Sequence, residues 1–175
     1  FTPELILVCL ALALLIIDAF IPRLPKRYLG LAGALGVAVA FFLVARPVIC
    51  PACEVSVTPD HFWYTFSYST WYTIAAKCII LIAAFMTFVM LSETRAVTSR
   101  FVTGSADNQD GTGELYILPL FATAGMMWMC SAIDFISLFV ALELTTLSFY
   151  VMVGFLRRNV GSLEGGIKYL VTGAM

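Results

Sequence analysis

Long apolar runs divide the chain into segments that short polar stretches separate. Each of the first five runs is close to the ~20 residues that a helix needs to cross a hydrocarbon core. The runs do not alternate apolar with polar positions, so they predict membrane-spanning helices and not barrel strands. The predicted spans are 4–21, 29–45, 72–91, 115–132 and 135–155, and the start of a sixth covers 162–175. We expect one all-α integral membrane domain, a polytopic transmembrane helix bundle, over residues 1–175.

The two ends of the chain predict a fragment of a longer polytopic protein. The sixth run reaches Met175 after about 13 residues, which is too short to cross a bilayer. The chain begins at Phe1 without an initiator methionine. The opening run has no basic n-region and no small-residue cleavage site, so it is interpreted as a first span and not as a signal peptide.

Composition supports a membrane protein. Of 175 residues, 61% are hydrophobic and 12% are charged, and the mean hydropathy is +0.97. Soluble domains contain about 45–50% apolar and about 25% charged residues. The net charge of −1 argues against a nucleic-acid partner. We therefore expect the lipid bilayer and other membrane proteins as partners.

The basic residues predict an orientation. The loops after the first, third and fifth runs share one side and contain Arg23, Lys26, Arg27, Arg95, Arg100, Arg157 and Arg158. The opposite side contains only Arg46. Because cytoplasmic loops carry the excess of Lys and Arg, the N-terminus is predicted on the outer (periplasmic) side of a bacterial inner membrane.

A "CPAC" sequence, Cys50 to Cys53, falls in the outer loop between the second and third runs. An oxidising compartment would permit a disulfide between these cysteines. A zinc site with His61 would lack a fourth ligand, and the spacing is a poor match. An inert or structural pair is favoured, without a metal. The other cysteines are expected to be small apolar packing residues: Cys9, Cys78 and Cys130.

Glu143 is the single acid within "SLFVALELTTLSFYVMVGF". An acid at the centre of a spanning helix costs roughly 2.5–3.5 kcal/mol on insertion scales. Counted from Asp134, a predicted N-cap, it lies about 13 Å into its helix and close to mid-membrane. Intramembrane acids are functional by default, although a permanently protonated structural acid is the alternative.

Lys168 is a possible partner on the next helix, roughly 10 Å from the cytoplasmic edge. The two charges differ in depth by roughly 7 Å, which a long side chain or one or two waters would close. Opposite charges keep each other ionised, and a change in their separation alters both proton affinities. This arrangement predicts a proton relay. Lys168 also has a local partner, Glu164, one helical turn earlier.

Other polar residues are secondary candidates for a proton path. Thr146 and Ser148 are expected to hydrogen-bond within their helix or to hold water. Lys77 either belongs to the path or extends its ammonium outward to the headgroups. Glu4 and Asp18, at the two ends of the first run, are expected to be interfacial. The sequence contains no recognisable phosphate-binding loop, iron–sulfur cysteine cluster or nucleophile elbow.

Residues 113–175 resemble subunit N of the NADH:quinone oxidoreductases, respiratory complex I, which is the bacterial counterpart of mitochondrial subunit 2. The similarity lies in "LFVALELTTLSFYVMVGF", a short arginine loop and "SLEGGIKY", with 25 residues from Glu143 to Lys168. The "CPAC" loop departs from the family's pattern.

The resemblance implies an antiporter-like, proton-translocating subunit that couples quinone reduction elsewhere in the complex to proton pumping. It places Glu143 and Lys168 in a proton channel. It implies no cofactor in this chain, because FMN, iron–sulfur clusters and NADH would bind other subunits. Two alternatives remain: a subunit of a multi-subunit cation/proton antiporter or membrane-bound hydrogenase, and a purely structural subunit of the membrane arm.

Overall fold

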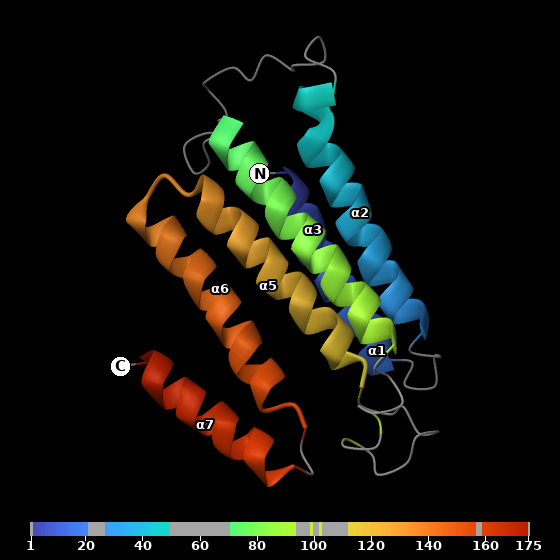
Figure 1. Ribbon diagram of the computed structural model, residues 1–175, viewed down its shortest axis with the longest axis vertical. Helices are drawn as coiled ribbons and strands as arrows, with labels where there is room; N and C mark the ends of the chain where they lie inside the picture. Colours follow the sequence, from blue (N-terminus) through green and yellow to red (C-terminus); the bar gives the residue numbers. More distant parts are fainter. Residues whose placement is uncertain are drawn as a thin grey trace.

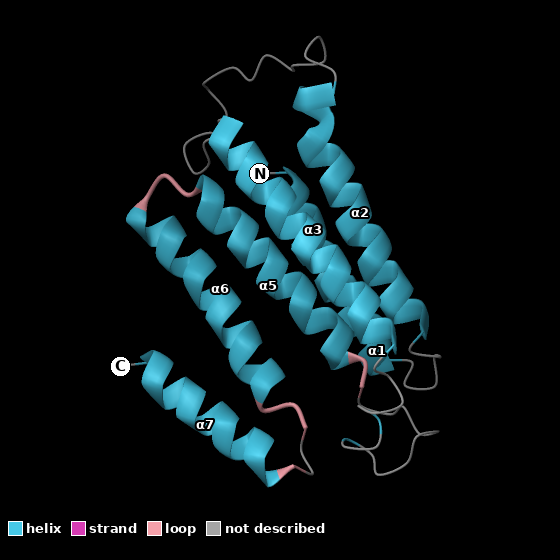
Figure 2. Ribbon diagram, in the orientation of Figure 1, coloured by secondary structure: helices cyan, strands magenta, loops and turns pink. Residues whose placement is uncertain are grey.

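The computed structural model describes residues 2–20, 27–49, 71–93, 99, 102, 112–156 and 159–174. Its elements are α1 (Thr2–Phe20), α2 (Arg27–Ile49), α3 (Trp71–Glu93), α5 (Glu114–Ser131), α6 (Phe135–Val153) and α7 (Val160–Ala174). Over this part of the chain every element is a helix, as Figure 2 shows. The predicted all-α class is confirmed.

The helices run up and down in one bundle (Figure 1). Helices α2 and α5 pack against each other, and both contact α1 and α3; α6 packs on α5, and α7 packs on α6. The start of α1, the start of α3, the end of α5 and the start of α6 all lie at the same end of the bundle. We call this the outer end, following the predicted orientation.

Each of the six predicted runs coincides with one helix, and the bounds differ by a few residues. The largest difference is in α2, which extends from Arg27 to Ile49. Helix α6 ends at Val153 because Gly154 forms its C-cap, two residues before the predicted end. Asp134 occupies the predicted N-cap position of α6, but its side chain forms no capping hydrogen bond.

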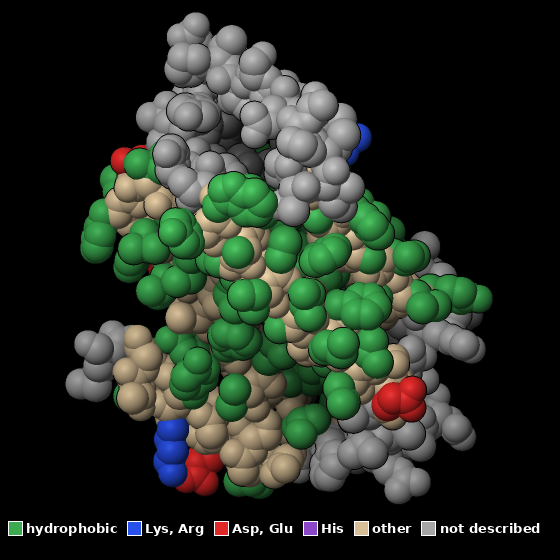
Figure 3. Space-filling view, turned by 45° about the horizontal axis from the view of Figure 1, so that its top comes forward, with side chains coloured by type: hydrophobic (Ala, Val, Ile, Leu, Met, Phe, Trp, Pro, Cys, Tyr) green, Lys and Arg blue, Asp and Glu red, His purple; other side chains and the backbone are tan. Residues whose placement is uncertain are grey.

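Among the described helices, four are long and apolar enough to cross a membrane: α1, α2, α3 and α6. Large apolar side chains such as Phe42, Tyr72 and Phe139 are exposed on their outer faces. Figure 3 shows apolar side chains over most of the described surface on one face. A monomeric soluble protein rarely exposes so much contiguous apolar surface, so these faces are suited to lipid. The chain is a membrane-embedded, multi-pass protein.

Helix α5 is the most enclosed helix, since it packs against α1, α2, α3 and α6. Its buried face includes Leu120, Met127, Thr123 and Gly125. A methyl group on Gly125 would lie 2.9 Å from the carbonyl oxygen of Ala141 in α6, so glycine permits the close crossing of α5 and α6. Protein therefore surrounds most of α5.

Candidate functional site

Glu143 lies eight residues into α6, about 12 Å from the first residue of that helix. Its side chain is half-buried. Within the described helices its carboxylate forms no ion pair. Glu143 precedes Tyr150 by seven residues, so the two side chains share one face of the helix.

That face of α6 is the one that meets α7. The rings of Tyr150 and Tyr169 meet edge-on, with centroids 5.0 Å apart. An added methyl group on Gly173 would collide with the Tyr150 ring, and one on Gly166 would lie 2.9 Å from the Cα atom of Gly154. Glycine at positions 166 and 173 therefore permits the close approach of α7 to α6.

Lys168 lies eight residues into α7, about 12 Å from the first residue of that helix. Its Nζ atom is 2.5 Å from Glu164 Oε1, and the two side chains are 72% and 60% exposed. The local pair expected from the sequence is therefore present. Lys168 is two residues from Gly166, or about 200° around the helix, so it projects away from α6. The structure brings Lys168 to Glu164 and not to Glu143.

The hydroxyl groups near Glu143 hydrogen-bond within their own helix. Thr146 Oγ1 donates to the carbonyl oxygens of Leu142, at 3.0 Å, and Glu143, at 3.2 Å. Ser148 Oγ donates to the carbonyl oxygen of Leu144, at 2.7 Å. This is the first of the two roles expected for them. A hydroxyl that donates in this way still has lone pairs that accept from water.

Lys77 and Glu4 meet in the interior of the bundle. The buried ammonium of Lys77 contradicts the outward extension that was one of its two expected roles. Glu4 lies in the first turn of α1, at the end of its span as expected, but its side chain is buried. Lys77 Nζ is 2.5 Å from Glu4 Oε1, and the side chains are only 7% and 3% exposed. The neighbouring helices cover both groups, so a buried ion pair joins α1 to α3. Sequence analysis missed this pair, although both residues were visible as ionisable positions in the outer parts of spans.

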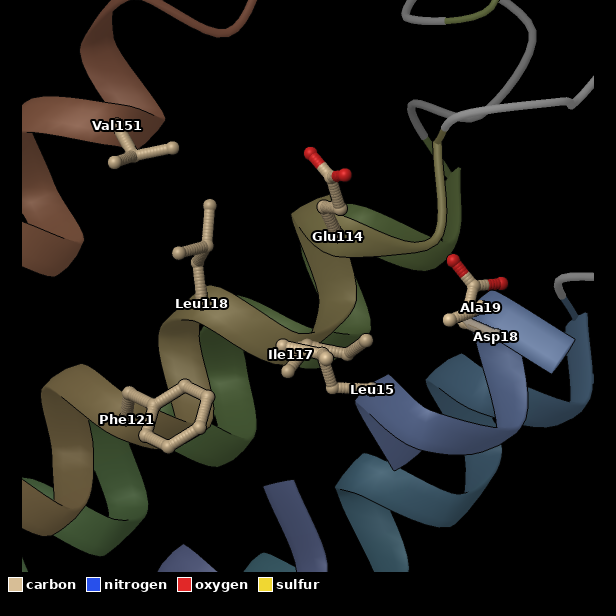
Figure 4. A pocket seen from close by; sticks show the side chains of 8 residues that line it. All are labelled: Leu15, Asp18, Ala19, Glu114, Ile117, Leu118, Phe121 and Val151. Carbon is tan, nitrogen blue, oxygen red and sulfur yellow. The ribbon is translucent and has the colours of Figure 1, made fainter. Parts of the chain in front are cut away.

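Asp18 and Glu114 lie at the other end of the bundle, opposite the outer end. They line a groove of about 230 Å³ between α1 and α5, whose other walls include Leu15, Phe121 and Val151. Figure 4 shows the two carboxylates at this groove. Asp18 is half-buried there. The groove is otherwise apolar.

The cysteines and His61 offer no described metal centre. Cys50, Cys53 and His61 lie outside the described residues. Among the residues that the structure describes, no group of three His, Cys, Asp or Glu side chains can hold a metal ion. Cys9, Cys78 and Cys130 are free thiols in the helices. Cys9 is exposed on the surface of α1, and the other two are half-buried.

The fold and these groups define a polytopic helical membrane protein that carries ionisable side chains within its spans. The chain is 34% identical over 99% of its length to "F(420)H(2) dehydrogenase subunit N" of Methanosarcina mazei. It is 33% identical over 98% of its length to NADH-quinone oxidoreductase subunit N of Trichlorobacter lovleyi. The resemblance of this chain to subunit N is confirmed.

The chain spans about a third of the length of these curated relatives, 33% and 32%. A shorter region is 51% identical over 65 residues to a subunit N of Rhizobium meliloti. A solved structure of respiratory complex I from Thermus thermophilus contains a chain with this fold. Its TM-score is 0.69 at 22% identity, over 98% of this chain and 33% of that chain. No family model matches the sequence.

Proposed function

We propose that this chain is part of a proton-translocating, antiporter-like subunit N of an NADH:quinone-oxidoreductase-type complex. The observation that carries the proposal is the position of Glu143: a half-buried acid near the middle of an apolar helix, on the face toward α7. The sequence similarity to subunit N over nearly the whole chain supports it. An acid at that depth is energetically costly, so its presence indicates a functional role.

Lys168 and Glu143 form the proton-handling unit in this proposal. They lie at similar depths on consecutive helices, about 12 Å from the outer and cytoplasmic helix ends respectively. Lys168 has an alternative partner in Glu164. When its ammonium group moves between Glu164 and Glu143, the proton affinity of Glu143 falls on approach and rises on departure. Lys168 acts as a movable charge and Glu143 as the group that gains and loses the proton.

The electron donor belongs to other subunits. Relatives whose names refer to F(420)H(2) and to NADH are equally similar to this chain, at 34% and 33% identity. A chain that bound the donor itself would be expected to distinguish these two molecules. We therefore propose that FMN, the iron–sulfur clusters and the quinone site lie on other subunits, with which this chain assembles in the membrane.

We further propose a bacterial inner membrane with the N-terminus on the outer side. The support is the distribution of basic residues along the sequence. A cysteine accessibility assay with a membrane-impermeant thiol reagent tests it. In the full-length protein, a single cysteine placed next to Phe1 should react in whole cells, whereas one in loop 156–161 should react only after lysis.

The experiment for the function is Glu143→Gln in the full-length protein within the assembled complex. We expect assembly to persist and proton translocation in proteoliposomes to fall at least tenfold. Glu143→Asp, which keeps the ionisable group, should retain a substantial part of the rate. If the assembled Glu143→Gln complex pumps protons at the normal rate, the proposed function is wrong and the purely structural role is supported. Proton exchange for sodium without any electron donor would favour the cation/proton antiporter.

A further inference from the structure

The Glu4–Lys77 pair is a second site with proton-handling chemistry. Glu4 lies two residues into α1 and Lys77 six residues into α3, about 3 Å and 9 Å from the outer helix ends. Long side chains so close to a membrane surface ordinarily extend to water. Here both are buried and form an ion pair of 2.5 Å. Protein packing holds them away from the surface.

Stability does not explain the pair. Removing two charges from water costs more than their attraction commonly returns, and well-packed apolar residues are often at least as stable in their place. Apolar side chains of similar size would fill the space that Glu4 and Lys77 occupy. The retained charges therefore point to a role that needs ionisable groups.

The surroundings of the pair contain further polar groups. Thr73 precedes Lys77 by four residues, so it lies on the same face of α3, and it is buried. Cys130, a half-buried thiol, lies near the outer end of α5, which packs against both α1 and α3. Ser131, the next residue, is buried at the outer end of α5 and donates to backbone carbonyl oxygens of its own helix.

Small polar side chains also occupy the buried face of α6, the helix of Glu143. The buried residues of α6 are Ser137, Ala141, Thr145 and Ser148, three of which carry hydroxyl groups. They repeat every three or four residues and so form one stripe, which faces α5 where Thr145 meets Gly125. Hydroxyl groups both donate and accept, and they can exchange partners with water.

We propose that Glu4 and Lys77 form a proton-exchange site at the outer end of the bundle, which passes protons from the Glu143 region to the outer water. The proposal rests on the function proposed above. A proton that reaches the site converts the Glu4 carboxylate to the acid and leaves the Lys77 ammonium unpaired. The unpaired ammonium releases a proton outward and becomes an amine. Glu4 then returns its proton to Lys77, and the ion pair is restored with one proton transferred.

Lys77→Arg in the full-length protein within the assembled complex tests this cycle. Arginine keeps the charge and the ion pair, but it does not deprotonate in proteins. We expect an assembled complex whose initial rate of proton translocation in proteoliposomes falls at least fivefold. Normal translocation by the arginine variant would overturn the proposal, because the pair would then act through its charge alone.

The double variant Glu4→Gln, Lys77→Met decides the case if arginine prevents assembly. It replaces both groups with neutral side chains of similar size, so a structural ion pair is removed without leaving one charge unpaired. Loss of proton translocation in the assembled double variant supports the proton-exchange site, and normal translocation overturns it. Thr87→Val is a matched control on α3, since Thr87 is exposed and its hydroxyl bonds only to Ala83 of its own helix.

The comparison with Glu143→Gln separates the two proposals. If Glu143→Gln abolishes translocation and the Glu4 and Lys77 variants do not, the outer site is wrong and the proposed function stands. If Glu143→Gln pumps normally, the proposed function fails whatever the outer pair does. Infrared difference spectra during turnover give an independent readout. A carboxyl band that Glu4→Gln removes and Glu143→Gln retains would show that Glu4 itself is protonated, and its absence would contradict the cycle.

Discussion

Gly166 of α7 lies against Gly154 at the end of α6, backbone to backbone. An added methyl group on Gly166 would lie 2.9 Å from the Cα atom and 3.1 Å from the nitrogen of Gly154. Neither atom belongs to a flexible side chain, so the two helices would have to separate. The spacing between the helices that carry Glu143 and Lys168 therefore depends on this glycine contact.

We expect Gly166→Ala to destabilise the packing of α7 on α6 by about 1–3 kcal/mol, the usual cost of overfilling a close contact. Gly165→Ala is the matched control, because a methyl group there meets only Val153 Cγ1, at 3.8 Å. The control should be neutral or slightly stabilising, since alanine favours a helix over glycine by up to ~1 kcal/mol. Reversible unfolding of the full-length protein in mixed micelles measures both. Equal effects of the two variants would contradict the close contact.

Ser162 ties the start of α7 to the end of α6. Its Oγ atom donates a hydrogen bond of 2.5 Å to the carbonyl oxygen of Val153, nine residues earlier. We expect Ser162→Ala to lower the free energy of unfolding by about 0.5–1.5 kcal/mol, as for a typical lost hydrogen bond. Ser162→Thr, which keeps the hydroxyl, should retain most of the stabilisation that the hydrogen bond provides. If alanine and threonine destabilise alike, the hydrogen bond does not account for the effect.

The Glu164–Lys168 pair should contribute little to stability. Both side chains are more than half exposed in this chain, and exposed pairs at this helical spacing contribute only about 0.3–0.5 kcal/mol. We therefore expect Glu164→Gln to change the unfolding free energy by less than about 0.5 kcal/mol. Glu164→Gln should nevertheless affect function. Because Lys168 loses its local partner, the rate of proton translocation in the assembled complex should change, whereas Thr172→Val, one turn beyond Lys168, should leave that rate unchanged.

The sequence predicted the helices well, because their apolar runs match the length that a hydrocarbon core demands. It also predicted how far along their helices Glu143 and Lys168 lie, since that distance follows from counting residues. It did not predict the direction in which Lys168 points. That direction depends on which face of α7 meets α6, and the packing of Gly166 and Gly173 decides it.

The error for Glu4 and Lys77 has the same origin. An acid two residues into a span and a lysine six residues into another are both within reach of the headgroups. Counting residues along the helices therefore predicts that both side chains are exposed to water at the membrane surface. Only the packing of α1 and α3 against α5, which is distant from α1 in sequence, reveals that protein covers both groups. Pairing between non-consecutive helices was not readable from a single sequence.

Single substitutions of the buried pair should be more damaging than the double substitution. Glu4→Gln leaves the Lys77 ammonium buried without its carboxylate, and Lys77→Met leaves the carboxylate without its ammonium. Breaking a buried pair in this way costs about 3–5 kcal/mol. The double variant Glu4→Gln, Lys77→Met leaves no buried charge, so we expect it to recover most of that loss. Unfolding of all four proteins in mixed micelles forms a double-mutant cycle, in which a coupling energy well above 1 kcal/mol is expected. Additive losses would mean that the two groups do not interact in the folded protein.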